Sequence, residues 1–222
     1  MKYLSVIKKI IILYFILSFL EWFNHNLIMH GNPDTLNKIP LVGNMLSSIN
    51  IEHLDHHKEV KMDMTINKLS NHTDHGMYFS WNTIPLITLE FLLLLLVFNL
   101  FGNLKNNILV ALLSGIFYGV IWNTIHPMMH KFNIDITWKD GIPNLKNVKL
   151  NNVFYKWLLK NHSLHHYQKD NKGNYNILLP GFDLLANTYY NRCYDNTEYC
   201  KKNDDEKTCS NDKLLKRCLT VL

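Results

Sequence analysis

The stretch of sequence that decides the fold is "ILVALLSGIFYGVIWNTIHPMMH", residues 108–130. Its first 18 residues contain no charged side chain. At a helical rise of ~1.5 Å per residue, they cover most of a hydrocarbon core that is ~30 Å thick. The stretch then ends in His126 and His130, which are four residues apart and therefore share one helix face. It predicts a membrane-crossing helix over 106–125 whose end carries two candidate metal ligands.

Two further apolar segments extend this pattern. Residues 83–101 contain a single charge, Glu90, and with 106–125 they predict a transmembrane hairpin. Residues 1–23 begin with lysines and look like a signal peptide, but no small-residue cleavage site follows, so we expect a retained helix. A buried helical hairpin in a soluble bundle is the alternative for the two central segments. The predicted fold class is all-α: an integral-membrane helical protein with about three membrane-crossing helices.

We expect one domain over 1–222, with a histidine-rich region at 126–190 and a polar tail at 191–222. Three crossings would put the long polar segments on one side of the membrane. Those segments hold most of the Lys and Arg, whereas the hairpin turn holds only Lys105, so the positive-inside rule predicts that this side is cytoplasmic.

The four cysteines all lie in the tail, at Cys193, Cys200, Cys209 and Cys218. Their separations match neither a zinc ribbon nor a redox pair. Cytoplasmic thiols stay reduced, so we expect them to be unpaired, with a metal site in the tail as the alternative.

The overall composition is that of an ordinary soluble protein only on average. Hydrophobic residues make up 47% of the chain and the mean hydropathy is −0.09, which are ordinary values for a soluble protein. These averages mislead, because the apolar residues are concentrated in a few segments. The formal net charge is +5. Its lysines are spread over polar segments without a basic helix face or zinc-finger spacing, so we expect an anionic membrane surface and no nucleic acid as the partner.

Ten of the 12 histidines fall into four short groups: His25 and His30; His53, His56 and His57; His126 and His130; and His162, His165 and His166. Two groups share the pattern HxxHH, which on a helix aims three imidazoles in similar directions. An imidazole nitrogen binds a first-row metal at ~2.0–2.1 Å, so groups on facing helices can converge on one ion. Ten imidazoles suit two ions.

Two of these spacings require a local break in an α-helix. His25 and His30 are five residues apart, which turns them ~140° away from each other on an ideal helix. We expect them to straddle a helix end set by Gly31 and Pro33. His126 precedes Pro127, so we expect the helix to bend there, with Pro127 opening the next turn.

Chance clustering of surface or core histidines is the alternative for any single group, but four groups together favour a metal site. The chain has no Glu-x-x-His pair and no HExxH, so it predicts neither a carboxylate-rich di-iron bundle nor a zinc hydrolase. Neutral imidazole ligands suit a pair of iron ions that react with O₂, and zinc remains the alternative metal.

The order HNLIMH, HLDHH, HPMMH, HSLHH resembles the fatty acid hydroxylase and sterol desaturase superfamily of integral-membrane di-iron enzymes. The resemblance covers about 21–188 and includes Asn174, Tyr175 and Asp183 after the last group. It departs at Asn187, where the family often has glycine. It also departs between the third and fourth groups, which the fatty acid 2-hydroxylases place closer together. The β-carotene hydroxylases, with similar histidine groups, are the second resemblance.

The resemblance implies that the ten histidines hold two iron ions and that O₂ is the co-substrate. The implied reaction is hydroxylation, or desaturation, of a C–H bond in a fatty acyl, sphingolipid or sterol substrate of lipid biosynthesis, in an endoplasmic reticulum-type membrane. It implies an external electron donor, a b-type cytochrome and its reductase, because the chain has no haem or flavin motif. No catalytic side chain beyond the metal ligands is expected. A carotenoid hydroxylase and a non-catalytic metal-binding membrane protein remain the alternatives.

Several polar residues are candidates to support the ligands. Glu21, Asp183 and Asn174 are expected to orient them through hydrogen bonds. Glu90 is expected either to contact a substrate headgroup or to pair with a neighbouring helix. His72 and His75 are expected at the surface.

Overall fold

The computed structural model describes residues 2–61, 63–66, 78–98, 101–167 and 173–190. In these ranges the regular secondary structure is helical, with one isolated bridge between Val60 and Ile66 and no strand, so the all-α prediction is confirmed for them. The elements are α1 (Lys2–Phe23), the π-helix η1 (Asn24–Met29), α2 (Pro33–Asn37), α3 (Gly43–Glu59), the 3₁₀ turn η2 (Trp81–Thr83), α4 (Ile84–Val97), α5 (Leu104–Met129), α6 (Val153–Tyr167) and α7 (Phe182–Leu185).

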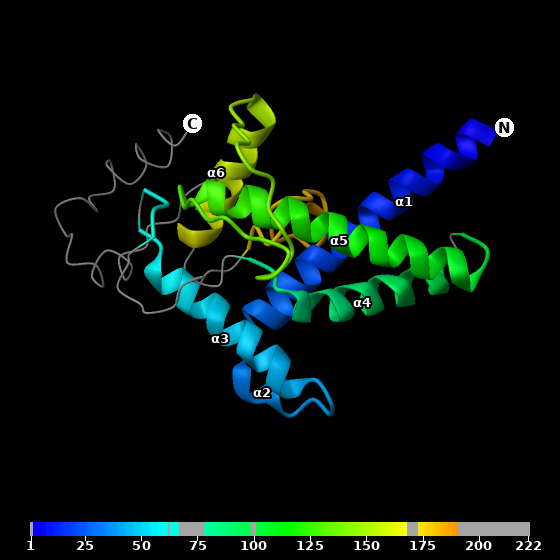
Figure 1. Ribbon diagram of the computed structural model, residues 1–222, viewed down its shortest axis with the longest axis horizontal. Helices are drawn as coiled ribbons and strands as arrows, with labels where there is room; N and C mark the ends of the chain where they lie inside the picture. The colour runs from blue at the N-terminus through cyan, green and yellow to red at the C-terminus, as the bar shows by residue number, and fades with distance from the viewer. Residues whose placement is uncertain (1, 62, 67–77, 99–100, 168–172, 191–222) are drawn as a thin grey trace.

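The three long apolar helices α1, α4 and α5 extend from one end of the molecule, and α2, α3 and α6 gather at the other (Figure 1). In α5, Gly115 permits a close approach to α4, because a Cβ at this position would lie 3.1 Å from Thr88 Oγ1. A small apolar core joins the three helices; its buried members are Ile16, Leu20, Phe91, Leu95 and Ala111.

Outside this core the same helices carry large apolar side chains on their surface. Ile10 of α1 is 60% exposed, Leu89 of α4 is 54% exposed and Phe117 of α5 is 67% exposed. Exposed apolar surface of this kind marks contact with a partner or with lipid. Among the described helices, α5 alone is long and apolar enough to cross a membrane.

By length and composition, the structure therefore provides one candidate span where the sequence predicts three. The predicted span 83–101 contains α4, which has 14 residues and ends at Val97. At ~1.5 Å per residue α4 is ~21 Å long, which is shorter than a hydrocarbon core. Even with η2 in front of it, Trp81–Val97 remains a shorter apolar helix. α1 has 22 residues and contains the three N-terminal lysines.

Helix α5 is longer than the predicted 106–125 at both ends. Its start is fixed by Asn103, whose side-chain oxygen accepts a hydrogen bond from the Asn106 N–H at 2.8 Å. Pro127 was expected to open a new turn, but it lies inside α5, which continues to Met129. So close to the helix end, proline removes a single backbone donor, and the Pro127 carbonyl still accepts from the His130 N–H at 3.1 Å. His126 and His130 consequently project from the end of one continuous helix.

Candidate metal centre

His25 and His30 face the same way because η1, which lies between them, is a π-helix. The His30 N–H donates to the His25 carbonyl at 3.1 Å, which is the five-residue hydrogen bond of this helix type. The two imidazole centroids are 5.2 Å apart. The expected helix end is present, since His30 is the C-cap residue. The π-helical turn places His25 and His30 on the same face, which an α-helix would not do.

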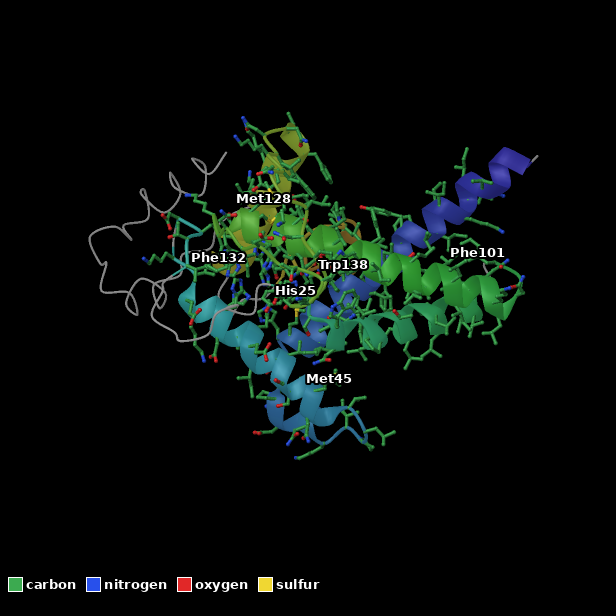
Figure 2. The ribbon with its side chains drawn as sticks, in the orientation of Figure 1. His25, Met45, Phe101, Met128, Phe132 and Trp138 are labelled. Atoms are coloured by element: carbon green, nitrogen blue, oxygen red, sulfur yellow. The ribbon has the colours of Figure 1, made fainter. Side chains whose placement is uncertain are left out.

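The other three histidine groups project from the C-terminal parts of α3, α5 and α6 toward η1. His25 lies near the middle of the molecule, between the apolar helices and α3 (Figure 2). Nine of the ten predicted ligands are buried, and His30 is partly buried. The structure therefore brings together the full set that the sequence singled out.

Five of these histidines form what we call the first group, in which one ring nitrogen of each lies within 4.8 Å of all the others: His25, His30, His53, His57 and His165. The Nε2 atom of His53 lies 3.0 Å from that of His25, 3.1 Å from that of His30 and 3.0 Å from that of His57. The Nε2 atom of His165 lies 3.1 Å from those of His30 and His57. Two nitrogens bound at ~2.1 Å to one ion and at right angles would lie ~3.0 Å apart, so the spacing fits ligands of a single ion.

Four more form the second group by the same criterion: His56, His126, His130 and His162. The Nε2 atoms of His130 and His162 are 2.8 Å apart. His166 adjoins this group, because its Nε2 lies 3.2 Å from that of His162. Its ring also lies 4.1 Å, centroid to centroid, from that of His57 in the first group. His166 therefore borders both groups.

Each HxxHH helix serves both groups, and the two helices do so in opposite ways. In α3 the pair spaced by four, His53 and His57, belongs to the first group, and His56 belongs to the second. In α6 it is His162 that belongs to the second group and His165 to the first. Neighbouring helix positions differ in direction by ~100°, which is why adjacent histidines reach different groups.

Three backbone carbonyls fix which ring nitrogen is free to bind. Nδ1 of His25 lies 2.7 Å from the Tyr175 carbonyl oxygen, Nδ1 of His165 lies 2.7 Å from that of Gly173, and Nδ1 of His130 lies 3.2 Å from that of Met64. A carbonyl oxygen only accepts, so each Nδ1 donates and the Nε2 of the neutral ring carries a lone pair. These lone pairs point at other imidazole nitrogens of the same group.

The crowding of nitrogens is the observation that tests whether a metal fits. A neutral imidazole has one N–H, so His53 Nε2 can satisfy at most one of its three close nitrogen neighbours. Both ring nitrogens of His56 are buried without a hydrogen-bond partner in the described part of the chain. Buried polar atoms without partners are costly. A cation in each group would turn these opposed lone pairs into ligands, so the residues fit two metal ions.

The electrostatics keep the rings in the form that binds metal. Burial, followed by repulsion from neighbouring imidazolium charge, holds the pKa of His53, His57 and His162 well below the ordinary value. Burial lowers the pKa of His165 to about 4, although its bond to the Gly173 carbonyl opposes this. The histidines are consequently neutral at physiological pH, as ligands must be.

Asn174 and Asp183 stabilise the loop whose Gly173 and Tyr175 carbonyls accept from His165 and His25. The Asn174 side chain donates to the Tyr190 carbonyl at 2.9 Å and accepts from the Tyr190 N–H at 2.7 Å. The Asp183 carboxylate accepts from the backbone N–H groups of Tyr175 at 3.1 Å and Asn176 at 2.7 Å. In the described residues these two side chains therefore support His25 and His165 through the loop backbone.

Glu21 secures the next part of the same loop. Its buried carboxylate accepts from the N–H groups of Leu178 and Leu179, both at 2.8 Å, and from the Tyr118 hydroxyl at 3.0 Å. These hydrogen bonds lead to the loop and to α5, whereas the sequence suggested a direct contact with His25. Glu90 pairs with η1, since the Asn24 side-chain N–H donates to its carboxylate at 2.8 Å.

Asn50 is a supporting residue that the sequence reasoning missed. It is fully buried in α3, and its amide N–H₂ donates to the carbonyls of Ile28, Met29 and Gly31 at 2.8, 2.9 and 3.0 Å. These carbonyls lie at the end of η1, around His30. The available signal was its position three residues before His53, on the face of α3 that carries the ligand.

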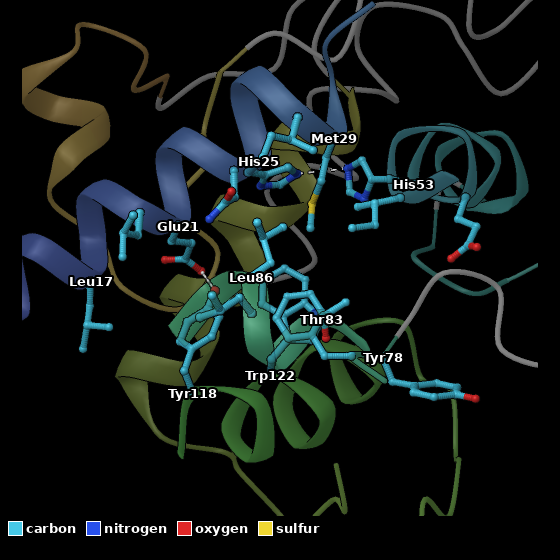
Figure 3. Close-up of a pocket in the computed structure, with 17 residues that line it drawn as sticks. Leu17, Glu21, His25, Met29, His53, Tyr78, Thr83, Leu86, Tyr118 and Trp122 are labelled. Carbon is cyan, nitrogen blue, oxygen red and sulfur yellow. Dashed lines mark hydrogen bonds between the residues drawn. The ribbon is translucent and has the colours of Figure 1, made fainter. Parts of the chain in front are cut away.

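An apolar cavity approaches the first group (Figure 3). It lies between α1, α3, α4 and α5, and the histidines in its lining are His25 and His53. Trp122 of α5 also lines it, and its ring lies 4.6 Å, centroid to centroid, from that of His126 in the second group. A ligand in the cavity would therefore meet the first group before the second.

His72, His75 and the four tail cysteines lie outside the described residues. Comparison of the chain with protein-family models, with characterised proteins and with solved structures finds no match.

Proposed function

We propose that this protein is an integral-membrane enzyme that uses two iron ions and O₂ to hydroxylate, or desaturate, a C–H bond of a lipid. The observation that carries the proposal is the convergence of ten histidines, nine in two adjoining groups and His166 bordering both, at the end of an apolar cavity. The resemblance of the four histidine segments to the fatty acid hydroxylase and sterol desaturase superfamily supports the same chemistry.

In this proposal the first group holds one ion and the second group, completed by His166, holds the other. Iron in such a centre supplies the O₂-dependent oxidation that side chains alone cannot perform. The chain's own residues hold the rings in the neutral form, fix their tautomers and keep water away. The all-imidazole ligands favour iron over a structural zinc site, because five histidines in one group exceed the four ligands of tetrahedral zinc.

The membrane part of the proposal has α5 crossing an endoplasmic reticulum-type bilayer, α1 and α4 packed beside it in the apolar region, and the histidines on the cytoplasmic side. It is supported by the apolar surface of these helices and by their extension to the end of the molecule opposite α3 and α6 (Figure 1). A lipid would then stay in the bilayer while its reacting carbon reaches the first group. Electrons would come from a b-type cytochrome and its reductase, because no haem or flavin motif is present in the sequence.

A non-catalytic metal-binding membrane protein is the second candidate from another class. The buried histidines alone suit it equally well. The cavity favours the enzyme, because storage or structural binding of a metal does not require an apolar path to the ligands. A carotenoid hydroxylase would share the metal centre and differ in the lipid that the cavity receives.

Lipid profiling tests the proposal. Cells that contain a competent electron donor should gain an oxygenated or newly unsaturated lipid when the protein is expressed. His165→Ala removes a ligand of the first group and should abolish that product, whereas Lys156→Ala on the exposed side of the same helix should retain it. An unchanged lipid pool with the unaltered protein, or a product that survives His165→Ala, would contradict the enzyme proposal.

A further inference from the structure

The segment that joins α5 to α6 carries positive charge that the protein itself does not neutralise. From 141 to 169 the sequence contains five lysines and no aspartate or glutamate. Lys146 pairs with Asp135 at 2.9 Å. Lys149 is exposed and has no ion-pair partner in the part of the chain that the structure describes. The surface of this segment is therefore suited to a negatively charged partner.

Exposed apolar side chains follow at the start of α6. Val153 is 85% exposed and Phe154 is 57% exposed. Asn152 fixes this first turn, because its side-chain oxygen accepts a hydrogen bond from the Tyr155 N–H at 2.8 Å. The ring of Phe154 stacks on that of Trp157, with 6.2 Å between the ring centroids. Exposed aromatic and aliphatic side chains beside lysines are typical of helices that lie in the interface of a membrane.

The same segment is fastened to the C-terminal part of α5. The Asn123 side chain donates to the Ile142 carbonyl at 2.7 Å, and the Leu145 N–H donates to the Thr124 hydroxyl at 2.9 Å. Residues of α6 share an apolar core with this part of α5, and Figure 1 shows α6 at the end of α5 opposite the turn to α4. If α5 crosses a membrane, the segment consequently lies at the level where the helix leaves the hydrocarbon.

We propose that a basic apolar surface, formed by Leu145, Lys149, Val153 and Phe154, rests in the headgroup layer of an anionic membrane leaflet. The apolar side chains enter the boundary between headgroups and acyl chains, and Lys149 contacts lipid phosphate. An acidic protein could also neutralise the lysine, but the position beside the end of α5 favours the membrane. The contact holds the histidine-bearing helix α6 close to the bilayer. The inference rests on the membrane part of the proposed function and not on the chemistry of the metal centre.

Fluorescence quenching of the full-length protein in lipid nanodiscs tests this contact. Serines replace the four tail cysteines, and Phe154→Cys then carries a single fluorophore. A spin label on the lipid headgroup should quench it at least threefold more strongly than a fluorophore on Lys58→Cys. Lys58 is the control because it is an exposed residue of α3, a helix that lies apart from the start of α6 (Figure 1). Equal quenching at the two positions would overturn the inference. If Phe154→Cys does not fold, Val153→Cys provides the same comparison.

Charge reversal makes the test specific for an anionic leaflet. Addition of phosphatidylserine to phosphatidylcholine nanodiscs should increase the quenching at Phe154→Cys at least twofold. Lys149→Glu in the same protein should remove most of this increase, because the glutamate repels anionic lipid. Lys61→Glu makes the same change of charge on an exposed residue outside the surface and should retain the increase. An increase that is the same in both variants would overturn the inference.

The results distinguish this inference from the proposed function. Strong quenching at Phe154→Cys without any lipid product from the unaltered protein would contradict the proposed oxidation alone. A lipid product together with a weakly quenched fluorophore at Phe154→Cys would overturn this inference alone. In that case the surface faces water in the isolated protein, and an acidic protein becomes the partner that its charge fits.

Discussion

At the scale of single residues, the centre depends on where each ring nitrogen points. The spacing of the histidines was enough to single out the ten side chains that the structure brings together, nine of them in the two groups and His166 beside them. It was not enough to divide them, because His56 and His57 are adjacent in the sequence and belong to different groups. That division depends on how α3, α5 and α6 pack together. The helical spacing of residues within each segment does not specify how these three helices pack against one another.

Glu21 shows how a residue outside the two groups can matter to them. In the described residues its carboxylate accepts from five donors: the side chains of Tyr118 and Asn176 and the backbone N–H groups of residues 177, 178 and 179. Glu21→Gln replaces one accepting oxygen with a donating N–H₂ group. The unmatched donors should cost about 1–3 kcal/mol, and each kcal/mol lowers the midpoint of thermal unfolding by about 2–4 °C in a chain of this size.

Thermal unfolding of the purified protein in detergent checks this prediction. The matched control is Glu52→Gln, because Glu52 is an exposed carboxylate on α3. We expect a lower midpoint for Glu21→Gln and an unchanged midpoint for Glu52→Gln. Equal midpoints for the two variants would show that the Glu21 carboxylate does not stabilise the loop.

At the scale of secondary-structure elements, η1 is the feature that the sequence did not reveal. The helix ends at Gly31 and Pro33 were visible, and so was the unfavourable five-residue spacing of His25 and His30. The π-helical turn that resolves this spacing is held by tertiary contacts, chiefly with Asn50. Local sequence preferences do not include such contacts. For α5, the rule for the residue before proline predicted that Pro127 opens a new turn, but the helix continues through it to Met129.

Asn50→Ala tests the contact that holds η1. The variant loses three hydrogen bonds to the carbonyls around His30, and we expect it to be destabilised by about 1–3 kcal/mol. Because His30 belongs to the first group, a chelator should also remove metal from the variant faster than from the unaltered protein. Asn44→Ala, on an exposed position of the same helix, is the control. The same rate of metal removal in both variants would show that Asn50 does not help the first group to retain its metal.

At the scale of the whole molecule, the buried histidines make the metal-free protein sensitive to acid. Burial lowers the pKa of His53, His56, His57, His162 and His166 well below the ordinary value. Below about pH 6.5 the unfolded chain binds protons that the folded chain does not. The free energy of unfolding therefore falls as the pH falls, by up to ~1.4 kcal/mol per pH unit for each histidine kept neutral.

Total stabilities of about 5–15 kcal/mol are typical of folded proteins. We therefore expect the metal-free protein to have a much lower thermal midpoint at pH 5.5 than at pH 7.5. The stabilising contribution is complete above the unfolded-state pKa and is lost progressively below it. Thermal unfolding at the two pH values, after removal of metal with a chelator, measures this. An equal or higher midpoint at pH 5.5 would contradict the burial of neutral histidines.

The two histidine groups are proposed to hold one metal ion each. The most direct test of this proposal is elemental analysis of the full-length protein, purified in detergent and supplied with Fe(II) without oxygen. We expect two iron ions per folded chain. One ion per chain, or none, would contradict it.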